Sequence, residues 1–517
     1  MNLRINKIWL WLIFILLAMP GVGFADDPEP LFNDISSIAA KDLRPDMKTT
    51  TLRERLVTVD FGLILRPADV QQGERLEVTS GMIVGKDKRS QKKKLLLNLF
   101  DDENLILNLE RVENTSPDGN TISWFGRVEG LPESEVILIN SDNVMSGNIT
   151  LPGGRFFHIR FISEGVHAIR EIDQTAFPPE AHPRVIEPPK TAPREPDTPP
   201  KSDPDTSGDS SSDPDEIYNI IDVMVVYTPA ARTAAGGTTA MNTLIDLAVT
   251  ETNQGYANSS ITQRINLVHR AEVSYTETSS DAFDNALDDL TGTSDGQIDF
   301  IHTWRNTYKA DMVSMFIDDS EWCGLGWVMY TESHDFEDSA FTIVAWNCAT
   351  GNYSFAHEMG HNQGGKHDIA HSSEDGVFEY SHGYQDPSED FRTIMAYDCP
   401  GGCTRVNYWS NTVVTYGGEA MGNTAKANMR RSHNNTYDTA SNWRVRVTTV
   451  YVNRAWIGLE LGIPSFPFNT ITEGVKAITP STQNGALWVT PGTYNESLTI
   501  DKPILFNNWG TGSILIE

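Results

Sequence analysis

The chain has 517 residues, too many for one ordinary hydrophobic core, so we expect about two to four domains. Its composition is 39% hydrophobic and 21% charged with 27 prolines, which is typical of a globular protein with room for an unfolded connector. The formal net charge of −30 excludes nucleic acid and anionic membrane surfaces as favoured partners, because both would repel so acidic a protein.

Residues 1–25 have the features of a signal peptide. Basic residues precede an apolar run over residues 8–19, and residues 23–25 supply small side chains at the positions that a signal peptidase reads. The alternative is an uncleaved membrane anchor, but a run of about 12 apolar residues is shorter than the roughly 20 needed to span a bilayer. We expect cleavage after Ala25 and a secreted, soluble mature protein.

Residues 26–176 predict an antiparallel β domain. Short segments of alternating apolar and polar residues, such as NLILNLERV and EVILINSD, are separated by turn residues such as Pro117-Asp118-Gly119. Residues 177–216 differ, because they are rich in proline, serine and acidic residues and have almost no large apolar side chains. Such a segment cannot bury enough surface to offset its ordering entropy, so we expect a disordered linker.

Residues 217–446 predict an α/β domain. Strand-like apolar runs such as IIDVMVVYT (220–228) and DMVSMFID (311–318) alternate with segments of helical periodicity, as in residues 238–259. Strands that alternate with helices favour a twisted, mostly parallel sheet.

The four cysteines all lie in this domain, and an even number in an exported protein suggests disulfides. Three pairings are available. We favour Cys323 with Cys348 and Cys399 with Cys403, because each pair brackets a stretch that flanks the histidine-rich motif described next. The CxxxC spacing of the second pair could instead contribute to a metal site, although two thiolates without nearby partners are a weak signal.

The stretch SFAHEMGHNQGGKHD, residues 354–368, has the spacing of a metal site. His357 and His361 are four residues apart and would project from the same side of a helix. Gly364 can adopt the positive φ that ends a helix and turns the chain, which would bring His367 to the same ion from another direction.

Three neutral imidazoles would leave Zn²⁺ with one open position and lower the pKa of a bound water to about 7. Glu358, next to the first ligand, would take the proton of that water and pass it to the leaving amine. The alternative is a surface helix with solvated histidines. The full pattern should occur by accident in roughly one chain per million, which favours the metal site.

At these residues the chain resembles the metzincin endopeptidases, whose elongated zinc signature matches HEMGHNQGGKHD. FRTIMAYD, residues 391–398, resembles their methionine turn. The resemblance implies that Met395 is an apolar floor beneath the zinc and does not bind it, a role close to ordinary core packing. Asp368 is similar to the aspartate of the reprolysin (adamalysin-like) branch, where it is structural, buried and hydrogen-bonded.

Tyr397 follows the methionine with a spacing that resembles astacins and serralysins, in which this tyrosine approaches the zinc and stabilises the oxyanion. Reprolysins generally lack it, so transition-state stabilisation and simple packing both stay open. Together with CGLGW at 323–327, the motifs look most like the secreted bacterial peptidyl-Asp metalloendopeptidases, a reprolysin-like group. A preference for aspartate is implied by that resemblance. Arg392 and Arg405 are candidates to recognise an acidic side chain, with ordinary solvated arginines as the alternative.

The segment SWFGRVEGLPESEVILINSDNVMSGNITLPGGRFFHI is similar to reprolysin propeptides, which implies a zymogen. Many such propeptides silence the zinc with a cysteine, but every cysteine here lies in the protease region. An aspartate or steric coverage must serve instead, if the enzyme is latent. The linker offers accessible aspartates that the enzyme could cut itself, namely Asp197, Asp203, Asp205, Asp209, Asp213 and Asp215.

Residues 447–517 resemble the first coils of right-handed parallel β-helix proteins of the pectin-lyase type. About three coils are too few for a polysaccharide-lyase groove, which favours a module that contacts a polysaccharide or a cell surface. The chain ends without an evident cap, so a truncated module is an alternative.

The sequence therefore predicts a secreted zinc endopeptidase that hydrolyses proteins or peptides. A catalytically inactive metzincin-fold adhesin or carbohydrate-binding protein is the alternative, but such proteins usually lose the glutamate or a histidine, and none is lost here. A structural Ca²⁺, the oligomeric state and the physiological substrate have no signal in the sequence.

Overall fold

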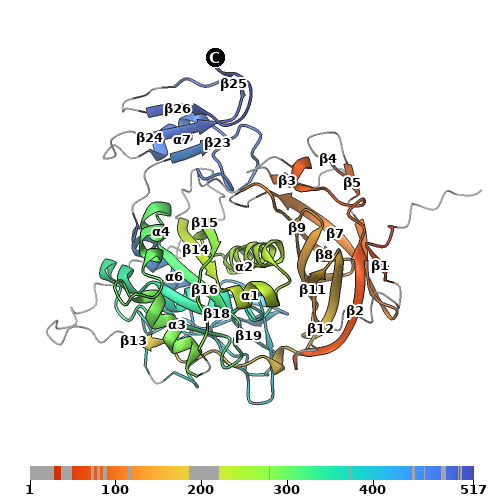
Figure 1. Cartoon of the computed structure of the whole chain (residues 1–517), viewed down its shortest axis with the longest axis vertical. Coiled ribbons are helices and arrows are strands. Elements are labelled where there is room, and N and C mark those ends of the chain that lie inside the picture. Colours follow the sequence, from red (N-terminus) through yellow and green to blue (C-terminus); the bar gives the residue numbers. More distant parts are fainter. Residues whose placement is uncertain are drawn as a thin grey trace, which may run out of the picture.

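A computed structural model describes residues 28–35, 49–70, 75–77, 82–84, 90–92, 94–114, 116, 118–185, 220–278, 280–372, 374–444, 449–458, 460, 462–478, 485–498, 500 and 504–517. The predicted signal peptide and residues 186–216 of the predicted linker lie outside these residues. The described part forms an N-terminal β-sheet domain, a central α/β domain and a small C-terminal module (Figure 1).

The N-terminal domain is built on a ten-stranded antiparallel sheet in the order β1-β2-β12-β11-β10-β9-β8-β7-β3, with β6 also paired to β7. Alternate residues of β6 and β7 are buried, whereas β10 is buried at every position, and the sheet supplies a continuous apolar core. The strands are β1 (Phe32–Asp34), β2 (Thr51–Val59), β3 (Arg75–Glu77), β6 (Lys94–Phe100), β7 (Glu103–Glu113), β8 (Ile122–Val128), β9 (Leu131–Ser141), β10 (Val144–Thr150), β11 (Phe156–Ser163) and β12 (Val166–Ile172), with β4 (Met82–Val84) and β5 (Ser90–Lys92) as a separate hairpin and a 3₁₀ turn over Pro67–Asp69.

The central domain contains a six-stranded sheet in the order β13-β17-β18-β16-β14-β15. All its pairs are parallel except β17 with β18, so the mostly parallel sheet expected from the sequence is present. Its strands are β13 (Arg184–Val185), β14 (Ile220–Tyr227), β15 (Arg264–Glu272), β16 (Met312–Ile317), β17 (Gly324–Val328) and β18 (Phe341–Ala345).

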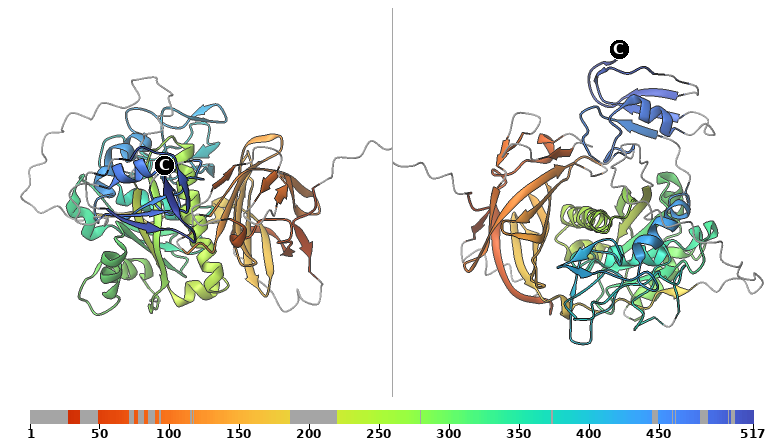
Figure 2. Two further views of the ribbon diagram at one scale, coloured as in Figure 1. Left: turned by 90° about the horizontal axis from the view of Figure 1, so that it is seen from above. Right: turned by 180° about the vertical axis from the view of Figure 1, so that it is seen from behind.

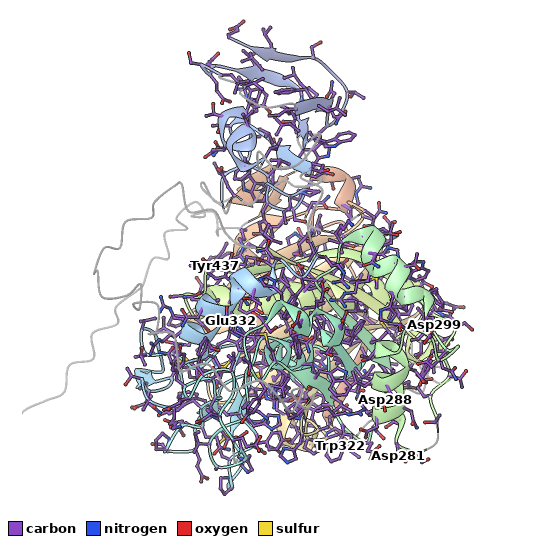
Figure 3. All side chains as sticks on the ribbon, turned by 90° about the vertical axis from the view of Figure 1, so that its left-hand side faces the viewer. Asp281, Asp288, Asp299, Trp322, Glu332 and Tyr437 are labelled. Carbon is purple, nitrogen blue, oxygen red and sulfur yellow. A yellow bond between two sulfur atoms is a disulfide. The ribbon has the colours of Figure 1, made fainter. Side chains whose placement is uncertain are left out.

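The helices of this domain are α1 (Pro229–Ala234), α2 (Thr238–Asn258), α3 (Ala282–Thr291), α4 (Phe300–Tyr308), α5 (Ser354–Asn362) and α6 (Met429–Ala440), with 3₁₀ turns over Gln174–Ala176 and His334–Ser339. Four two-residue strands complete it, β19 (Phe391–Arg392), β20 (Thr404–Arg405), β21 (Thr415–Tyr416) and β22 (Glu419–Ala420). Acidic side chains lie on its outside, where Figure 3 places Asp281, Asp288 and Asp299 on the flank that carries α3 and α4.

Strand β14 is buried on both faces because helices cover both sides of the sheet. Val223 and Val225 point into the core that α2 and α5 share, whereas Met224 and Val226 point into the core that α3 covers. This arrangement explains why the sequence of β14 is apolar without alternation apart from Asp222.

Residues 177–185 differ from the disordered linker expected to begin at residue 177. They lie along the α/β domain and end in β13, which extends the sheet beyond β17. Proline favours the extended backbone that an added edge strand needs, so Pro178-Pro179 suits this position. Composition alone did not reveal that the segment has partners elsewhere in the chain.

The C-terminal module contains parallel strands that stand apart from the other two domains (Figure 2). Strands β23 (Thr449–Val452), β24 (Gly485–Val489) and β26 (Ile504–Asn508) form one parallel sheet, and β25 (Gly492–Tyr494) pairs in parallel with β27 (Ile514–Ile516). Helix α7 (Ile471–Ala477) covers this core. Parallel coils are what the β-helix interpretation expects, and that interpretation stays a prediction. Among the described residues, no helix combines the length and apolarity needed to cross a bilayer.

Helix α2 lies between the two sheets (Figure 1). One side carries Leu244 and Ile245 into the core of the central domain, and the other carries Leu247 against β8 and β9. Glu251 on α2 is 3% exposed and accepts hydrogen bonds from the Asn148 side chain of β10 and from Gly351 N at 3.1 Å. Burial raises the pKa of Glu251 from 4.5 to about 8.

The raised pKa makes the stability of the intact chain depend on pH. Folded Glu251 holds a proton that the unfolded chain releases, so its contribution is complete below pH 4.5 and is lost as pH rises through about 8. We expect the free energy of unfolding to fall by up to about 1.4 kcal/mol per pH unit from this group.

Thermal unfolding of Glu251→Gln and its parent measures this effect. The Tm of Glu251→Gln should rise relative to the Tm of its parent as pH rises from 7 to 8.5. The Tm of the exposed-site control Glu133→Gln should keep a constant difference from that of the parent. A constant Tm difference for Glu251→Gln over this range would contradict the assignment.

Candidate metal centre

Helix α5 is buried along its whole length. Phe355, Ala356 and Met359 pack into the core shared with β14 and α2. This packing sets the rotation of the helix, so that His357 and His361 face the methionine-turn region. The helix ends at a turn in which Gly364 N donates to His361 O at 2.8 Å and Gly365 N donates to Gly360 O at 2.8 Å.

Gly364 is required at this turn for two reasons. Its φ is +85°, a conformation that side chains with a Cβ rarely adopt, and a Cβ there would lie 2.4 Å from Cβ of Val377 and 2.9 Å from Met329 O. The turn returns the chain so that His367 meets the helix, as expected from the sequence.

The three histidines come together with their Nε2 atoms facing inward. His367 Nε2 lies 3.1 Å from the Nε2 of both His361 and His357, and each imidazole is 0% exposed. His357 Nδ1 is 2.8 Å from Ile394 O, and His361 Nδ1 is 2.7 Å from Gly365 O. These carbonyls accept Nδ1–H, so both Nε2 lone pairs point toward the centre.

This donor set fits a zinc ion. Neutral imidazole nitrogens about 2.0–2.1 Å from a tetrahedral zinc lie roughly 3.3 Å from one another, close to the observed spacing. Burial lowers the pKa of His361 to about 3 and lowers the pKa of His357 and His367 well below 6.5, so all three are neutral ligands at pH 7. Converging lone pairs without a cation would repel one another. Within the described residues, this trio is the cluster that could hold a metal ion.

Glu358 lies beside the trio with both carboxylate oxygens buried and without a hydrogen-bond partner among the described residues. It faces β17, where a Cβ on Gly324 would lie 2.4 Å from its Oε1 and a Cβ on Gly326 would lie 3.0 Å from its Oε2. The two glycines therefore make room for this carboxylate. Burial, followed by the charge of Glu180, raises the pKa of Glu358 well above 4.5.

Met395 and Asp368 occupy supporting positions. Met395 is fully buried next to α5, with its Sδ where a Cβ on Gly360 would come within 2.6 Å. Asp368 is 3% exposed and accepts hydrogen bonds from Tyr397 N at 3.0 Å and from His371 Nδ1 at 2.9 Å. The floor and the structural aspartate that the family resemblance implies stay predictions for Met395 and Asp368.

Tyr397 lies at the trio, but its hydroxyl is already engaged. Its ring centroid is 4.0 Å from that of His367, and its hydroxyl donates to Glu180 O at 2.7 Å. Burial, followed by the charges of Glu180 and Glu358, raises the pKa of Tyr397, so the phenol is protonated at neutral pH and available as a donor.

The two arginine candidates are buried, which removes the alternative of solvated side chains. They line a cavity of about 340 Å³ together with Tyr397 and His371. Arg392 is held within its own loop, where it donates to Ala396 O at 3.0 Å and lies 3.5 Å from Asp398. Arg405 donates to Glu180 Oε1 at 2.6 Å.

Several neighbours of the site were missed by the sequence analysis. Glu180 and His182 were placed in the linker, Asn352 lay outside the motif, and Ser354, the first residue of the 354–368 stretch, was given no role. The glycines of CGLGW were used only as part of the family resemblance. The Pro178-Pro179 pair was the available signal, because consecutive prolines favour the extended backbone that an edge strand accepts.

Both disulfides join the pairs favoured from the sequence. Cys323 and Cys348 have Cα atoms 5.4 Å apart and connect the start of β17 to the loop that leads into α5. Cys399 and Cys403, also 5.4 Å apart, close the loop between Tyr397 and Arg405. The two bridges thus restrain segments on either side of the histidine trio.

The turn at Gly364 generates a prediction for metal binding. Gly364→Ala should weaken zinc binding by at least about tenfold, because the strained and crowded turn would displace His367. Gly130→Ala is the matched control, since Gly130 also has a positive φ (81°) but no atom within 4 Å of an added Cβ. Zinc content after dialysis against a weak chelator measures the effect. Full zinc occupancy in Gly364→Ala would show that the turn is not needed.

Comparisons with known proteins agree with this geometry. A family model described as metallo-peptidase family M12 matches residues 218–410. The chain is 38% identical over 305 residues to a peptidyl-Asp metalloendopeptidase of Xanthomonas campestris, an alignment that covers 59% of this chain and 69% of that protein. It is 36% identical over 345 residues to one of Stenotrophomonas maltophilia (63% and 78%), and 39% identical over 167 residues to one of Pseudomonas fragi (32% and 85%). The chain belongs to the M12 family of metallopeptidases and is a zinc metalloendopeptidase that acts on proteins or peptides.

Proposed function

We propose that the protein is a secreted zinc endopeptidase in which Glu358 is the general base and acid, with a preference for an aspartate next to the scissile bond. The observation that carries the proposal is the buried carboxylate of Glu358, which has no hydrogen-bond partner in the part of the chain that the structure describes and lies beside three inward-facing imidazoles. The names of the relatives, peptidyl-Asp metalloendopeptidases, support the aspartate preference.

Different residues of the chain supply different parts of the proposed reaction. Zinc held by His357, His361 and His367 would supply Lewis-acid activation of water and of the scissile carbonyl. Glu358 takes the proton of the attacking water and delivers it to the leaving amine, and its dry surroundings favour a proton-accepting group with a raised pKa. Tyr397 donates its hydroxyl hydrogen bond to the developing oxyanion once Glu180 O has left it.

The edge strand β17 provides the surface for substrate backbone. A peptide in extended conformation can add to an exposed sheet edge, where backbone hydrogen bonds supply affinity and side-chain pockets supply specificity. In the structure residues 178–185 hold this edge, so the N-terminal domain and its tail act as a propeptide in the proposal.

We propose that the enzyme cuts its own linker. The chain between β13 and β14 contains the six candidate aspartates Asp197, Asp203, Asp205, Asp209, Asp213 and Asp215. Cleavage there separates the N-terminal domain from the catalytic domain, which the structure otherwise joins through the interface around α2.

The C-terminal module is proposed to contact a polysaccharide or a cell surface. Tyr451, Trp488 and Trp509 gather their rings on the parallel sheet, with centroids 6.4 Å apart for the first two and 5.1 Å for Tyr451 with Trp509. Aromatic rings of this kind stack on apolar faces of a ligand. The alternative of an inactive binding protein for the whole chain has no support, because Glu358 and all three histidines are present.

Removal of the general base tests the proposal. Glu358→Ala should lower casein hydrolysis by about 10²- to 10⁴-fold with zinc content unchanged, because the ligands stay in place. A zinc chelator should abolish the activity of the parent. Glu374→Ala changes an exposed glutamate, so it is the control and should keep full activity. Chelator-resistant proteolysis, or full activity of Glu358→Ala, would contradict the mechanism.

Self-processing has a separate test. We expect the Glu358→Ala chain to accumulate with an intact linker, and added active enzyme to cut it before one or more of the six aspartates. Mass spectrometry of the products locates the cuts. Normal linker cleavage in pure Glu358→Ala protein would show that another protease does the work.

A further inference from the structure

Residues 178–185 form a continuous parallel addition to the edge of β17. Cys323 N donates to Pro179 O at 2.9 Å, and Ala181 N donates to Gly324 O at 2.9 Å. Farther along, β13 pairs in parallel with β17, with Arg184 opposite Trp327. The segment therefore lies on the strand that also makes room for Glu358.

The segment also passes directly over the metal centre. Glu180 O accepts the hydroxyl hydrogen bond of Tyr397, whose ring lies against His367. Two residues later, the ring of His182 lies 5.6 Å from the ring of His367. Within the described residues the potential ligand cluster contains the three histidines alone, so the segment covers the centre without adding a ligand to it.

The carboxylate of Glu180 sits in a built anion site. Its Oε1 accepts from Arg405 at 2.6 Å, from Ser354 Oγ at 2.8 Å and from Asn352 Nδ2 at 3.3 Å, and the side chain is fully buried. A guanidinium from β20 and a hydroxyl and an amide at or just before the start of α5 thus converge on one carboxylate oxygen.

Arg405 is held in place independently of Glu180. It donates to Asn352 O at 2.8 Å and to Ala396 O at 3.1 Å, and it is only 2% exposed. Backbone carbonyls therefore fix the guanidinium, leaving one face for a carboxylate. A buried, pre-positioned cation binds an acidic side chain strongly and disfavours a neutral one, which leaves the charge without a partner. Arg392 contacts Ala396 O and Asp398 within its own loop, so its guanidinium does not offer a comparable face to a carboxylate.

We propose that Arg405, Ser354 and Asn352 form the subsite that recognises the acidic side chain of a substrate, and that Glu180 occupies this subsite as an internal blocking residue. The proposal rests on the proposed endopeptidase function. It names the residues that select an acidic side chain in the substrate. It also explains how the metal centre is covered without a cysteine, because release of residues 178–185 frees the edge of β17, the Tyr397 hydroxyl and the acid subsite together.

The first experiment does not depend on activity. In the intact Glu358→Ala chain, hydrogen exchange of the Ala181 amide should become at least about tenfold faster on Glu180→Gln, because the charge that anchors the segment is removed. Arg184→Gln is the matched control, since it changes the same segment where Arg184 meets Asp288 at 2.6 Å and leaves the Glu180 contacts in place. Unchanged protection in Glu180→Gln would overturn the anchoring role.

The second experiment measures specificity in chains with Glu358 intact. Two fluorogenic peptides that differ only in aspartate or asparagine after the scissile bond give a ratio of kcat/KM values. Arg405→Lys should lower the aspartate-to-asparagine ratio by about tenfold or more, chiefly through KM, and Ser354→Ala should lower it less while keeping the fold. Glu180→Gln should raise the initial rate of peptide hydrolysis by the uncleaved chain several-fold and leave the aspartate-to-asparagine ratio unchanged.

The outcomes separate the two proposals. An unchanged aspartate-to-asparagine ratio in active Arg405→Lys and Ser354→Ala would overturn the subsite. Absence of proteolysis in every chain, the parent included, would instead refute the endopeptidase function, and the exchange measurement would still report whether Glu180 anchors the segment.

Discussion

The catalytic domain depends on one electrostatic constraint: the Nε2 atom of His367 lies 3.1 Å from the Nε2 atoms of both His357 and His361, and all three rings are fully buried. Two of the rings are oriented by carbonyls that accept Nδ1–H, so their lone pairs have no direction other than inward. A bound cation shared by the three nitrogens makes this arrangement favourable. The buried helix α5, the turn at Gly364 and the loop that carries Ile394 each serve to hold these rings.

The edge strand β17 is the second element on which function depends. Its two glycines receive the Glu358 carboxylate on one side, and its free edge receives residues 178–185. The same strand therefore positions the Glu358 carboxylate and the backbone of residues 178–185. Its disulfide to Cys348 restrains the strand relative to the loop before α5. Strand β17 therefore contacts both the Glu358 carboxylate and the segment that covers the metal centre.

The sequence was sufficient for features that depend on local spacing. The histidine trio, Glu358, Gly364 and the family follow from one stretch of 15 residues, because helix periodicity and glycine geometry determine how it folds. The parallel sheet follows from alternating strands and helices. The comparisons confirm the family and the enzyme class.

Features that depend on distant partners could not be predicted. Glu180 lies in a segment whose composition indicates disorder, yet it is buried against Arg405, 225 residues later in the chain. Nothing near either residue reveals that pairing. Arg405 likewise had no local sign that it would be buried. Asn352 and Ser354 precede the first zinc-ligand histidine. Their place in the acid subsite is apparent only from their hydrogen bonds to the Glu180 carboxylate.

The central claim is that three neutral imidazoles share one zinc ion. X-ray absorption at the zinc K-edge of the intact Glu358→Ala chain tests it most directly. The account predicts three imidazole nitrogens at about 2.0–2.1 Å, with the outer-shell scattering of histidine rings and no sulfur in the first shell. A sulfur contribution, or fewer than three imidazoles around the zinc, would contradict it.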